Sequence, residues 1–184
     1  MEIRLFGKNI LRFYSHHIME ISYADAKTGL SEDPELALEK IDPDRFSEIV
    51  SQVGSTVTTA NLRRLIAANG ERCEGFVLKR QGKPVGTAWV LYKGADDLEY
   101  RIRSIDAYLF GVYVNEAWRG RGYAGAMLRR VAEYLHGRGI DRACLTVSVS
   151  NESAIRAYEK TGFRTIYDRK FARFLKMNIP YHAL

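Results

Sequence analysis

The stretch Arg119-Gly120-Arg121-Gly122-Tyr123-Ala124 decides the fold of this chain, because it joins a strand to a helix. The residues before it, Tyr108 to Val114, are apolar and favour a strand. The two glycines let successive backbone N–H groups converge without a Cβ in the way, and the helix adds the positive end of its dipole. This junction predicts a binding site for a phosphate-bearing group.

The second half of the chain has a regular alternation of elements. After the turn, one apolar stripe at i, i+3, i+4, i+7 and i+11 predicts a helix over Tyr123–Leu135; its members are Ala124, Met127, Leu128, Val131 and Leu135. A buried strand follows, then a helix capped by Asn151 and ended by Gly162, and then a β segment split near Arg169. The ranges are Arg142–Val149, Asn151–Thr161 and Phe163–Met177. We therefore predict a βαβαβ order.

The first half is predicted to mix strands and helices. The expected elements are a strand at Leu11–Tyr23, a short helix at Glu35–Lys40, a helix opened by Pro43 over Asp44–Val53, a helix at Thr58–Ala68, and a hairpin of Phe76–Lys79 and Pro84–Tyr92. A long strand, Tyr100–Val114, then leads to the glycine turn. Because both of its faces are apolar from Ala107 onward, we expect it in the centre of the sheet.

Composition narrows the classes of function. A chain of 184 residues is long enough for one domain with a single core. The 28 Lys and Arg outnumber the 22 Asp and Glu by six, but they are dispersed, which argues against a nucleic-acid binder. No run approaches the ~20 apolar residues of a membrane span, and Met1 to Lys8 lack the apolar core of a signal peptide. We expect a cytoplasmic protein with neither a membrane nor a nucleic-acid partner.

The two cysteines give no sign of a disulfide or a metal site. Cys73 and Cys144 cannot form a disulfide framework, and they have no zinc-type spacing with the four histidines. Cys144 lies in an apolar run, so we expect a buried structural thiol there.

The glycine turn differs from two better-known phosphate-binding motifs. A Walker loop needs Gly-Lys-Ser/Thr, and a dinucleotide fingerprint needs three glycines and an acid about 20 residues on. Neither pattern is present. The chain instead has Arg-x-x-Gly-x-Ala at Arg119–Ala124 and, beyond the next strand, Asn151 followed by Ala157-Tyr158-Glu159-Lys160-Thr161-Gly162-Phe163.

With these motifs the chain resembles the GNAT superfamily of acyl-CoA-dependent N-acyltransferases, specifically over Ile105 to Arg164 and weakly before Glu74. The resemblance implies an α/β (α+β) fold with a mixed, mostly antiparallel central sheet, a splayed strand pair and flanking helices. It implies a single N-acetyltransferase domain over residues 1–184. Residues 1–73 would form the acceptor-side half, and residues 74–184 the acetyl-CoA-binding core.

The resemblance also implies where acetyl-CoA, the acyl donor, would bind, with no metal. Its pantetheine would pair with the backbone of Val112, Tyr113 and Val114 in the gap between the splayed strands. Asn151 would touch the pantetheine, and it can serve as an N-cap as well. The pyrophosphate would accept hydrogen bonds from backbone N–H groups and from the two arginine side chains of one run of the chain. This run comprises Arg119, Gly120, Arg121, Gly122, Tyr123, Ala124 and Gly125.

Catalytic roles follow from the same resemblance. Tyr158 matches the tyrosine that protonates the leaving thiolate, although helical spacing alone also suits a buried tyrosine. Asp106 is the candidate general base, since it begins the buried part of the central strand; Thr146 holds the other place where relatives carry a base. N–H groups near Phe110 or Val112 would polarise the thioester carbonyl. Because neither cysteine lies in the motif, we expect direct attack by the amine.

The acceptor is the least defined part of the prediction. We expect an enzyme that acetylates a small-molecule amine, a metabolite or an amino sugar, with a peptide or protein N-terminus or a lysine as the alternative. A non-catalytic acyl-CoA-binding module is an alternative of another class. His16 and His17 lie near the expected acceptor entry, but adjacent residues of a strand point to opposite faces, so only one could reach the site. The apolar C-terminal segment leaves a homodimer open.

Overall fold

A nine-stranded sheet runs through the part of the chain that this computed structural model describes, namely residues 2–5, 8–25, 33–42, 44–54, 59–95, 106–174 and 177–181. The strand order is β3-β4-β5-β6-β7-β2-β8-β9, and β1 pairs with β2. Among the strands of the described residues, only β6 and β7 pair in parallel. The strands are β1 Glu2–Leu5, β2 Lys8–Ser22, β3 Leu36–Lys40, β4 Cys73–Arg80, β5 Lys83–Tyr92, β6 Ala107–Val114, β7 Arg142–Ser148, β8 Arg164–Phe174 and β9 Met177–Tyr181.

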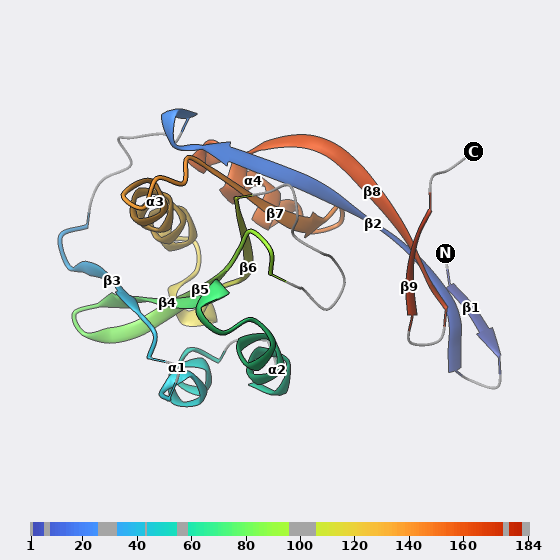
Figure 1. Cartoon of the computed structure of the whole chain (residues 1–184), viewed down its shortest axis with the longest axis horizontal. Coiled ribbons are helices and arrows are strands. Elements are labelled where there is room, and N and C mark those ends of the chain that lie inside the picture. Colours follow the sequence, from blue (N-terminus) through green and yellow to red (C-terminus); the bar gives the residue numbers. More distant parts are fainter. Residues whose placement is uncertain are drawn as a thin grey trace.

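In the described part of the chain, four α-helices cover the sheet, two on each face (Figure 1). Helices α1 (Phe46–Val53) and α2 (Thr59–Asn69) pack on one face, around Trp89, Leu91 and Tyr108. Helices α3 (Tyr123–His136) and α4 (Glu152–Thr161) pack on the other face, around Leu109 and Leu145. The described ranges also contain three short 3₁₀ turns: η1 Tyr23–Asp25, η2 Gly70–Arg72 and η3 Glu116–Trp118.

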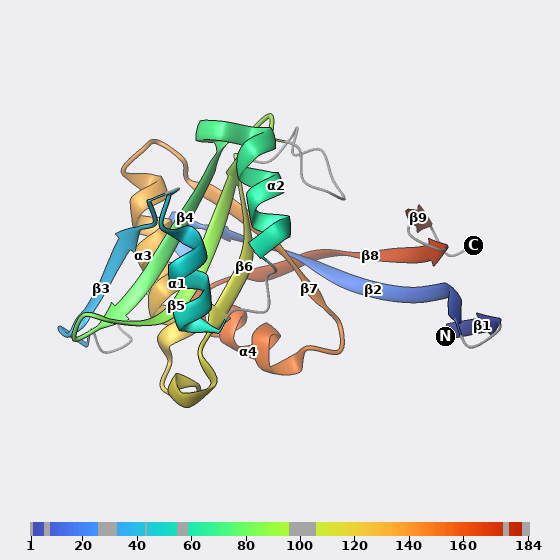
Figure 2. The same ribbon diagram turned by 90° about the horizontal axis from the view of Figure 1, so that it is seen from below.

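Strands β2 and β8 extend beyond the helix-covered body of the sheet as a two-stranded ribbon (Figures 1 and 2). The pairing of β2 with β8 runs from Leu11↔Phe174 to Glu20↔Arg164. Strands β1 and β9 pair with β2 and β8 at the outer end of the ribbon. None of the helices in the described ranges combines the length and the apolar character needed to cross a membrane.

The predicted fold class is confirmed: the sheet is mixed, mostly antiparallel and flanked by helices. The hairpin is β4 and β5, and the strand before the glycine turn is the central strand β6. Helix α4 is capped by the Asn151 side chain and ends at Gly162, as predicted. Pro43, Thr58 and Tyr100–Ile105 lie outside the described residues.

Two predictions about elements are wrong. Leu36–Lys40 forms strand β3 instead of a helix. Its large apolar side chains, Leu36 and Leu38, lie two residues apart and share one face, and the strand pairs along β4 from Leu36↔Arg80 to Lys40↔Phe76. The expected break near Arg169 is absent from β8, which runs through to Phe174. Strand β1 was not predicted.

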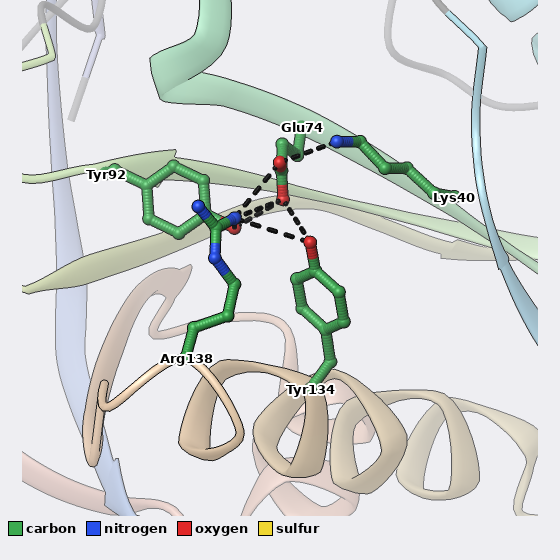
Figure 3. A network of polar contacts seen from close by, with 5 residues as sticks. All are labelled: Lys40, Glu74, Tyr92, Tyr134 and Arg138. Carbon is green, nitrogen blue, oxygen red and sulfur yellow. Dashed lines mark hydrogen bonds and ion pairs between the residues drawn. The ribbon is translucent and has the colours of Figure 1, made fainter.

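A buried carboxylate joins the two halves of the chain (Figure 3). Glu74, at the start of β4, accepts hydrogen bonds from Lys40 of β3 at 2.7 Å, from Tyr92 of β5 at 2.5 Å and from Tyr134 of α3 at 3.0 Å. Arg138, just after α3, donates to both carboxylate oxygens at 3.1 Å. Burial by itself would raise the pKa of Glu74, but these hydrogen bonds hold the pKa below its usual value. The network therefore fixes β3 and α3 to the same edge of the body.

Candidate functional site

The central strands β6 and β7 separate part of the way along their length. Their parallel ladder holds three pairs, Ala107↔Ala143, Tyr108↔Cys144 and Leu109↔Leu145. Strand β6 then continues to Val114 and β7 to Ser148 without pairing to each other. Backbone groups of both strands consequently face a gap, where an extended ligand can add to the sheet edge.

A β-bulge lies at the open end of β6. Trp89 of β5 pairs with Phe110 and Thr87 pairs with Tyr113, so one residue of β5 opposes two of β6, Gly111 and Val112. Gly111 has φ +57°, a left-handed value that glycine adopts without strain. A bulge bends its strand and re-aims backbone groups, and this one lies in the stretch of β6 that does not pair with β7. It coincides with the residues predicted to polarise the thioester.

The glycine turn closes this end of the gap. Gly120 and Gly122 have φ +76° and +79°, and a Cβ built on either glycine meets no atom within 4 Å. The first hydrogen bond of α3 runs from the Ala126 N–H to the Gly122 carbonyl, at 3.0 Å. Within the described ranges, the backbone N–H groups of Gly120 to Gly125 have no acceptor. The turn therefore presents unsatisfied donors and open space at the positive end of a helix, which suits an anion.

The two arginines of the motif differ in how they are held. Arg119 donates from Nε to the Val114 carbonyl at 3.1 Å, pairs with Glu116 at 3.2 Å and lies over the ring of Tyr113. Arg121 is exposed and lies over the ring of Trp118, 5.0 Å from its centroid. Arg119 thus links the turn to the end of β6 by a hydrogen bond, whereas the side chain of Arg121 is exposed at the surface of the turn.

Helix α4 approaches the same end of the sheet. Its N-cap, Asn151, accepts from the Ala154 N–H at 3.2 Å and from the Ser153 hydroxyl at 3.1 Å, so the capping role is confirmed. A Cβ at Gly125 would lie 3.2 Å from Oγ1 of Thr161, so only a small residue lets the start of α3 lie this close to α4. The turn and α4 are therefore packed as one unit.

Tyr158 lies inside α4, in the core that α3 and α4 share with the sheet. Its side chain is 8% exposed and packs against Phe163, with ring centroids 5.8 Å apart. Burial raises the pKa of Tyr158 to about 12. The phenol is therefore protonated at neutral pH and able to donate a proton.

A pair of hydroxyls that the sequence did not reveal lies at the fork between the strands. The Tyr108 hydroxyl and Oγ1 of Thr146 are 2.7 Å apart, one residue before and one residue after the last ladder pair. Tyr108 belongs to the core under α1 and α2, so the pair faces the side opposite α3 and α4. From the sequence, Thr146 stands at the second candidate position for a base. Its contact with the Tyr108 hydroxyl could be found only from the strand register.

The two histidines lie on opposite faces, as the alternation of a strand predicts. His17 pairs through Nδ1 with Asp168 at 2.6 Å, and its neighbour in β7 is Val147, which lies in the core under α3 and α4. His16 is in register with Ser148 and therefore shares the face of Thr146, two residues away. Of the two, His16 is the one on the side of the hydroxyl pair.

The structure does not bring Asp106 to the fork. Asp106 directly precedes β6, at the end where β6 and β7 are paired, and its backbone carbonyl accepts from the Lys93 N–H at 3.1 Å. Phe110 lies four positions further along the strand, a distance of about 13 Å. Its role as the general base stays a prediction without geometric support.

Neither cysteine is suited to covalent catalysis. Cys73 and Cys144 are both buried, as expected for Cys144. Burial raises the pKa of each thiol to about 12, so neither forms a thiolate near neutral pH.

Comparison with known proteins connects this geometry to one family. The profile of the acetyltransferase (GNAT) family matches residues 37–163. The L-amino acid N-acetyltransferase AaaT of Escherichia coli is 38% identical over 68 residues, which are 36% of this chain and 42% of that protein. The chain thus aligns with less than half of that relative's length.

Solved structures share the fold. A GCN5-related N-acetyltransferase from Sphaerobacter thermophilus superimposes with a TM-score of 0.63 at 18% identity, over 92% of this chain and 54% of that chain. A predicted acetyltransferase from Clostridium acetobutylicum, solved with acetyl-CoA, gives a TM-score of 0.51 at 20% identity, over 70% of this chain and 90% of that chain.

Proposed function

Because this chain belongs to the acetyltransferase (GNAT) family, we propose that it transfers the acetyl group of acetyl-CoA to a primary amine by direct attack in a ternary complex. The observation that carries the proposal is the unpaired stretch between β6 and β7, next to a turn whose N–H groups are unsatisfied among the described residues. A gap of this kind takes the extended arm of a cofactor, and the turn takes its diphosphate.

Each part of acetyl-CoA has a proposed place. The pantetheine pairs with the backbone of Val112, Tyr113 and Val114, and Asn151 lies beside its arm. The diphosphate accepts N–H bonds along Gly120–Gly125, where the absence of a Cβ on Gly122 leaves room for it. Arg121, exposed beside the turn, adds charge.

In the proposed reaction, the amine nitrogen forms a bond to the acetyl carbon while the carbon–sulfur bond breaks. N–H groups of the bulge near Phe110 and Val112 stabilise the oxyanion that develops on the carbonyl oxygen. The departing thiolate takes its proton from the hydroxyl of Tyr158. Since the buried thiols are protonated, no acyl-cysteine intermediate enters the sequence of steps.

A general base must take the proton of the amine. Asp106 is the residue proposed for this role, and it is the part of the mechanism with the least support. The test is an Asp106→Asn variant assayed across pH. A base role predicts loss of the acidic limb of the profile for kcat; an unchanged profile removes Asp106 from the mechanism.

The proposed acceptor is a small-molecule amine. The experiment that tests the function is a thiol-release assay with acetyl-CoA and a panel of amino acids, amino sugars and short peptides. Acceptor-dependent release supports an enzyme, and the preferred amine decides between a metabolite and a peptide N-terminus. Binding of CoA without release from any amine would support a non-catalytic acyl-CoA-binding module instead.

A further inference from the structure

Asn115 lies between the end of β6 and the 3₁₀ turn η3, which leads into the glycine turn. Its backbone N–H donates to the Val85 carbonyl of β5 at 2.9 Å, so the sheet fixes its position. Its side chain is half-buried and makes two further hydrogen bonds, one to Val53 and one to Ala117. One side chain therefore joins the end of the central strand to elements from both halves of the chain.

The bond to Ala117 shapes the approach to the glycine turn. Oδ1 of Asn115 accepts from the Ala117 N–H at 3.0 Å, the local contact by which an asparagine side chain caps a turn. The backbone carbonyl of Asn115 also accepts from the Trp118 N–H, at 2.9 Å. The proposed diphosphate donors, residues 120–125, follow directly after this capped turn, so Asn115 fixes the segment that presents them.

The bond to Val53 reaches the end of helix α1. Nδ2 of Asn115 donates to the Val53 carbonyl at 3.0 Å. The last carbonyls of a helix have no partner within the helix. At this helix end Gly54, with φ +70°, donates from its N–H to the carbonyls of Val50 and Ser51, whereas the Val53 carbonyl accepts from Asn115. Val53 is 0% exposed, so Asn115 supplies its hydrogen bond in the interior.

Helix α1 packs beside the bulge of β6. Phe46 of α1 makes an edge contact with Trp89 of β5, with ring centroids 6.3 Å apart, and Trp89 is in register with Phe110 at the start of the bulge. Trp89 is 2% exposed, and Phe110 packs against the same core. Because a close-packed core transmits displacements, the position of α1 affects the part of β6 that is proposed to polarise the thioester.

Asn115 thus connects the proposed diphosphate site with α1 through two hydrogen bonds of 3.0 Å. A diphosphate held by residues 120–125 would fix the turn, and with it η3 and the Asn115 side chain. The Val53 carbonyl would then face a donor with less freedom to move away, and the last turn of α1 would open less often.

We propose that Asn115 is a positioning residue that couples the two substrate sites: acetyl-CoA bound at the glycine turn stabilises the end of α1, in the acceptor-side half of the chain, through the Asn115 amide. The inference rests on the proposed function and adds a link from donor to acceptor. Asn115 contacts neither substrate in this role. Coupling of this kind is reciprocal, so an acceptor that stabilises α1 tightens the binding of acetyl-CoA by the same factor.

Hydrogen–deuterium exchange of the full chain, with and without saturating CoA, tests the coupling. We expect the amides of residues 50–54 to exchange about 5-fold more slowly with CoA, the effect of one net hydrogen bond. Unchanged exchange at these amides in the CoA complex would overturn the inference and leave the proposed function intact. A chain that does not bind CoA in isothermal titration would overturn the proposed function itself.

Two variants separate this link from a general loss of stability. Asn115→Ser keeps an oxygen that can cap η3, but its side chain is shorter and lacks the amide that bonds α1, so the slowing of exchange in α1 should be lost at saturating CoA. Asn69 of α2 is the matched control, because it is 5% exposed and its Nδ2 donates to the Leu65 carbonyl at 3.0 Å. Asn69→Ser should keep the full response of α1.

The two variants also decide between coupling and a purely structural role. Urea denaturation should show that both lower the stability of the fold, whereas only Asn115→Ser should lose the response of α1 to CoA. A full response in Asn115→Ser, or an equal loss in Asn69→Ser, would show that Asn115 is not the link.

Discussion

The hydroxyl of Tyr108 lies 2.7 Å from Oγ1 of Thr146, at the point where β6 and β7 part. The contact lies on the face opposite α3 and α4, and therefore on the other side of the sheet from the helix whose N-terminus is proposed to bind the diphosphate. A hydrogen bond here fixes the spacing of the two strands where the acetyl group would emerge.

Removing this contact should affect the acceptor and spare the donor. We expect Tyr108→Phe and Thr146→Val each to lower kcat/KM for the amine by about 5- to 10-fold, near 1 kcal/mol. The double variant should lose about as much as one single variant, because the two changes remove the same interaction. Steady-state kinetics measure the effect on the acceptor, and the Kd of CoA measures the effect on the donor. Fully additive losses, or an equal loss in Tyr23→Phe at the exposed η1 turn, would contradict a shared role.

Gly122 should be essential for the donor. We expect Gly122→Val to raise the Kd of CoA by about 100-fold or more, because its φ of +79° is strained for a β-branched residue and a Cβ fills the space above the turn. Isothermal titration measures the affinity.

Gly139 offers a matched control for that change. Its φ is +78° and a Cβ there also meets nothing within 4 Å, but it lies beyond the opposite end of α3. Gly139→Val should therefore carry similar backbone strain and bind CoA normally. Equal loss of affinity in both variants would show that strain, and not occupation of the turn, is responsible.

Tyr158 should act in turnover and not in binding. We expect Tyr158→Phe to lower kcat by about 100-fold, the lower end for one general acid, while KM for acetyl-CoA changes little. A pKa near 12 keeps the phenol protonated, so kcat should not fall through loss of this proton below about pH 10. Wild-type kcat in the Phe variant would remove the acid role.

Glu74 should stabilise the fold in a pH-dependent way. Glu74→Gln should lower the free energy of unfolding at pH 7 by about 3 kcal/mol, since the neutral amide breaks a buried network of charged partners. Urea denaturation measures it, with exposed Glu133→Gln on α3 as the control.

The direction of the pH effect follows from the lowered pKa of Glu74. A carboxylate with a folded-state pKa below its ordinary 4.5 contributes stability above that value and loses it as pH falls through the folded pKa. The difference between wild type and Glu74→Gln should therefore shrink on acidification below about pH 4.5. A constant difference from pH 7 to pH 3 would mean that the carboxylate charge is irrelevant.

The sequence predicted best those features whose chemistry is local. The Gly120–Gly122 turn, the stripe of α3 and the Asn151 cap each depend on residues within one or two turns of chain, and all appear in the structure. The gap between β6 and β7 followed from the family resemblance, not from any residue pattern.

Features that depend on strand register could not be predicted. The contact between Tyr108 and Thr146 joins residues 38 positions apart, so it can be found only from the pairing of β6 with β7. Strand β3 was mistaken for a helix because five residues between turns carry too few positions to establish a period. Asp106 was favoured for its place before a buried strand, but sequence alone could not tell the paired end of β6 from the open end.

The most direct test of the account is a crystal structure of the chain with acetyl-CoA. We expect the pantetheine between β6 and β7, hydrogen-bonded to the backbone of Val112 to Val114, and the diphosphate within hydrogen-bonding distance of the N–H groups of Gly120 to Gly125. Acetyl-CoA bound elsewhere, or β6 and β7 paired beyond Leu109↔Leu145 through to their ends, would contradict it.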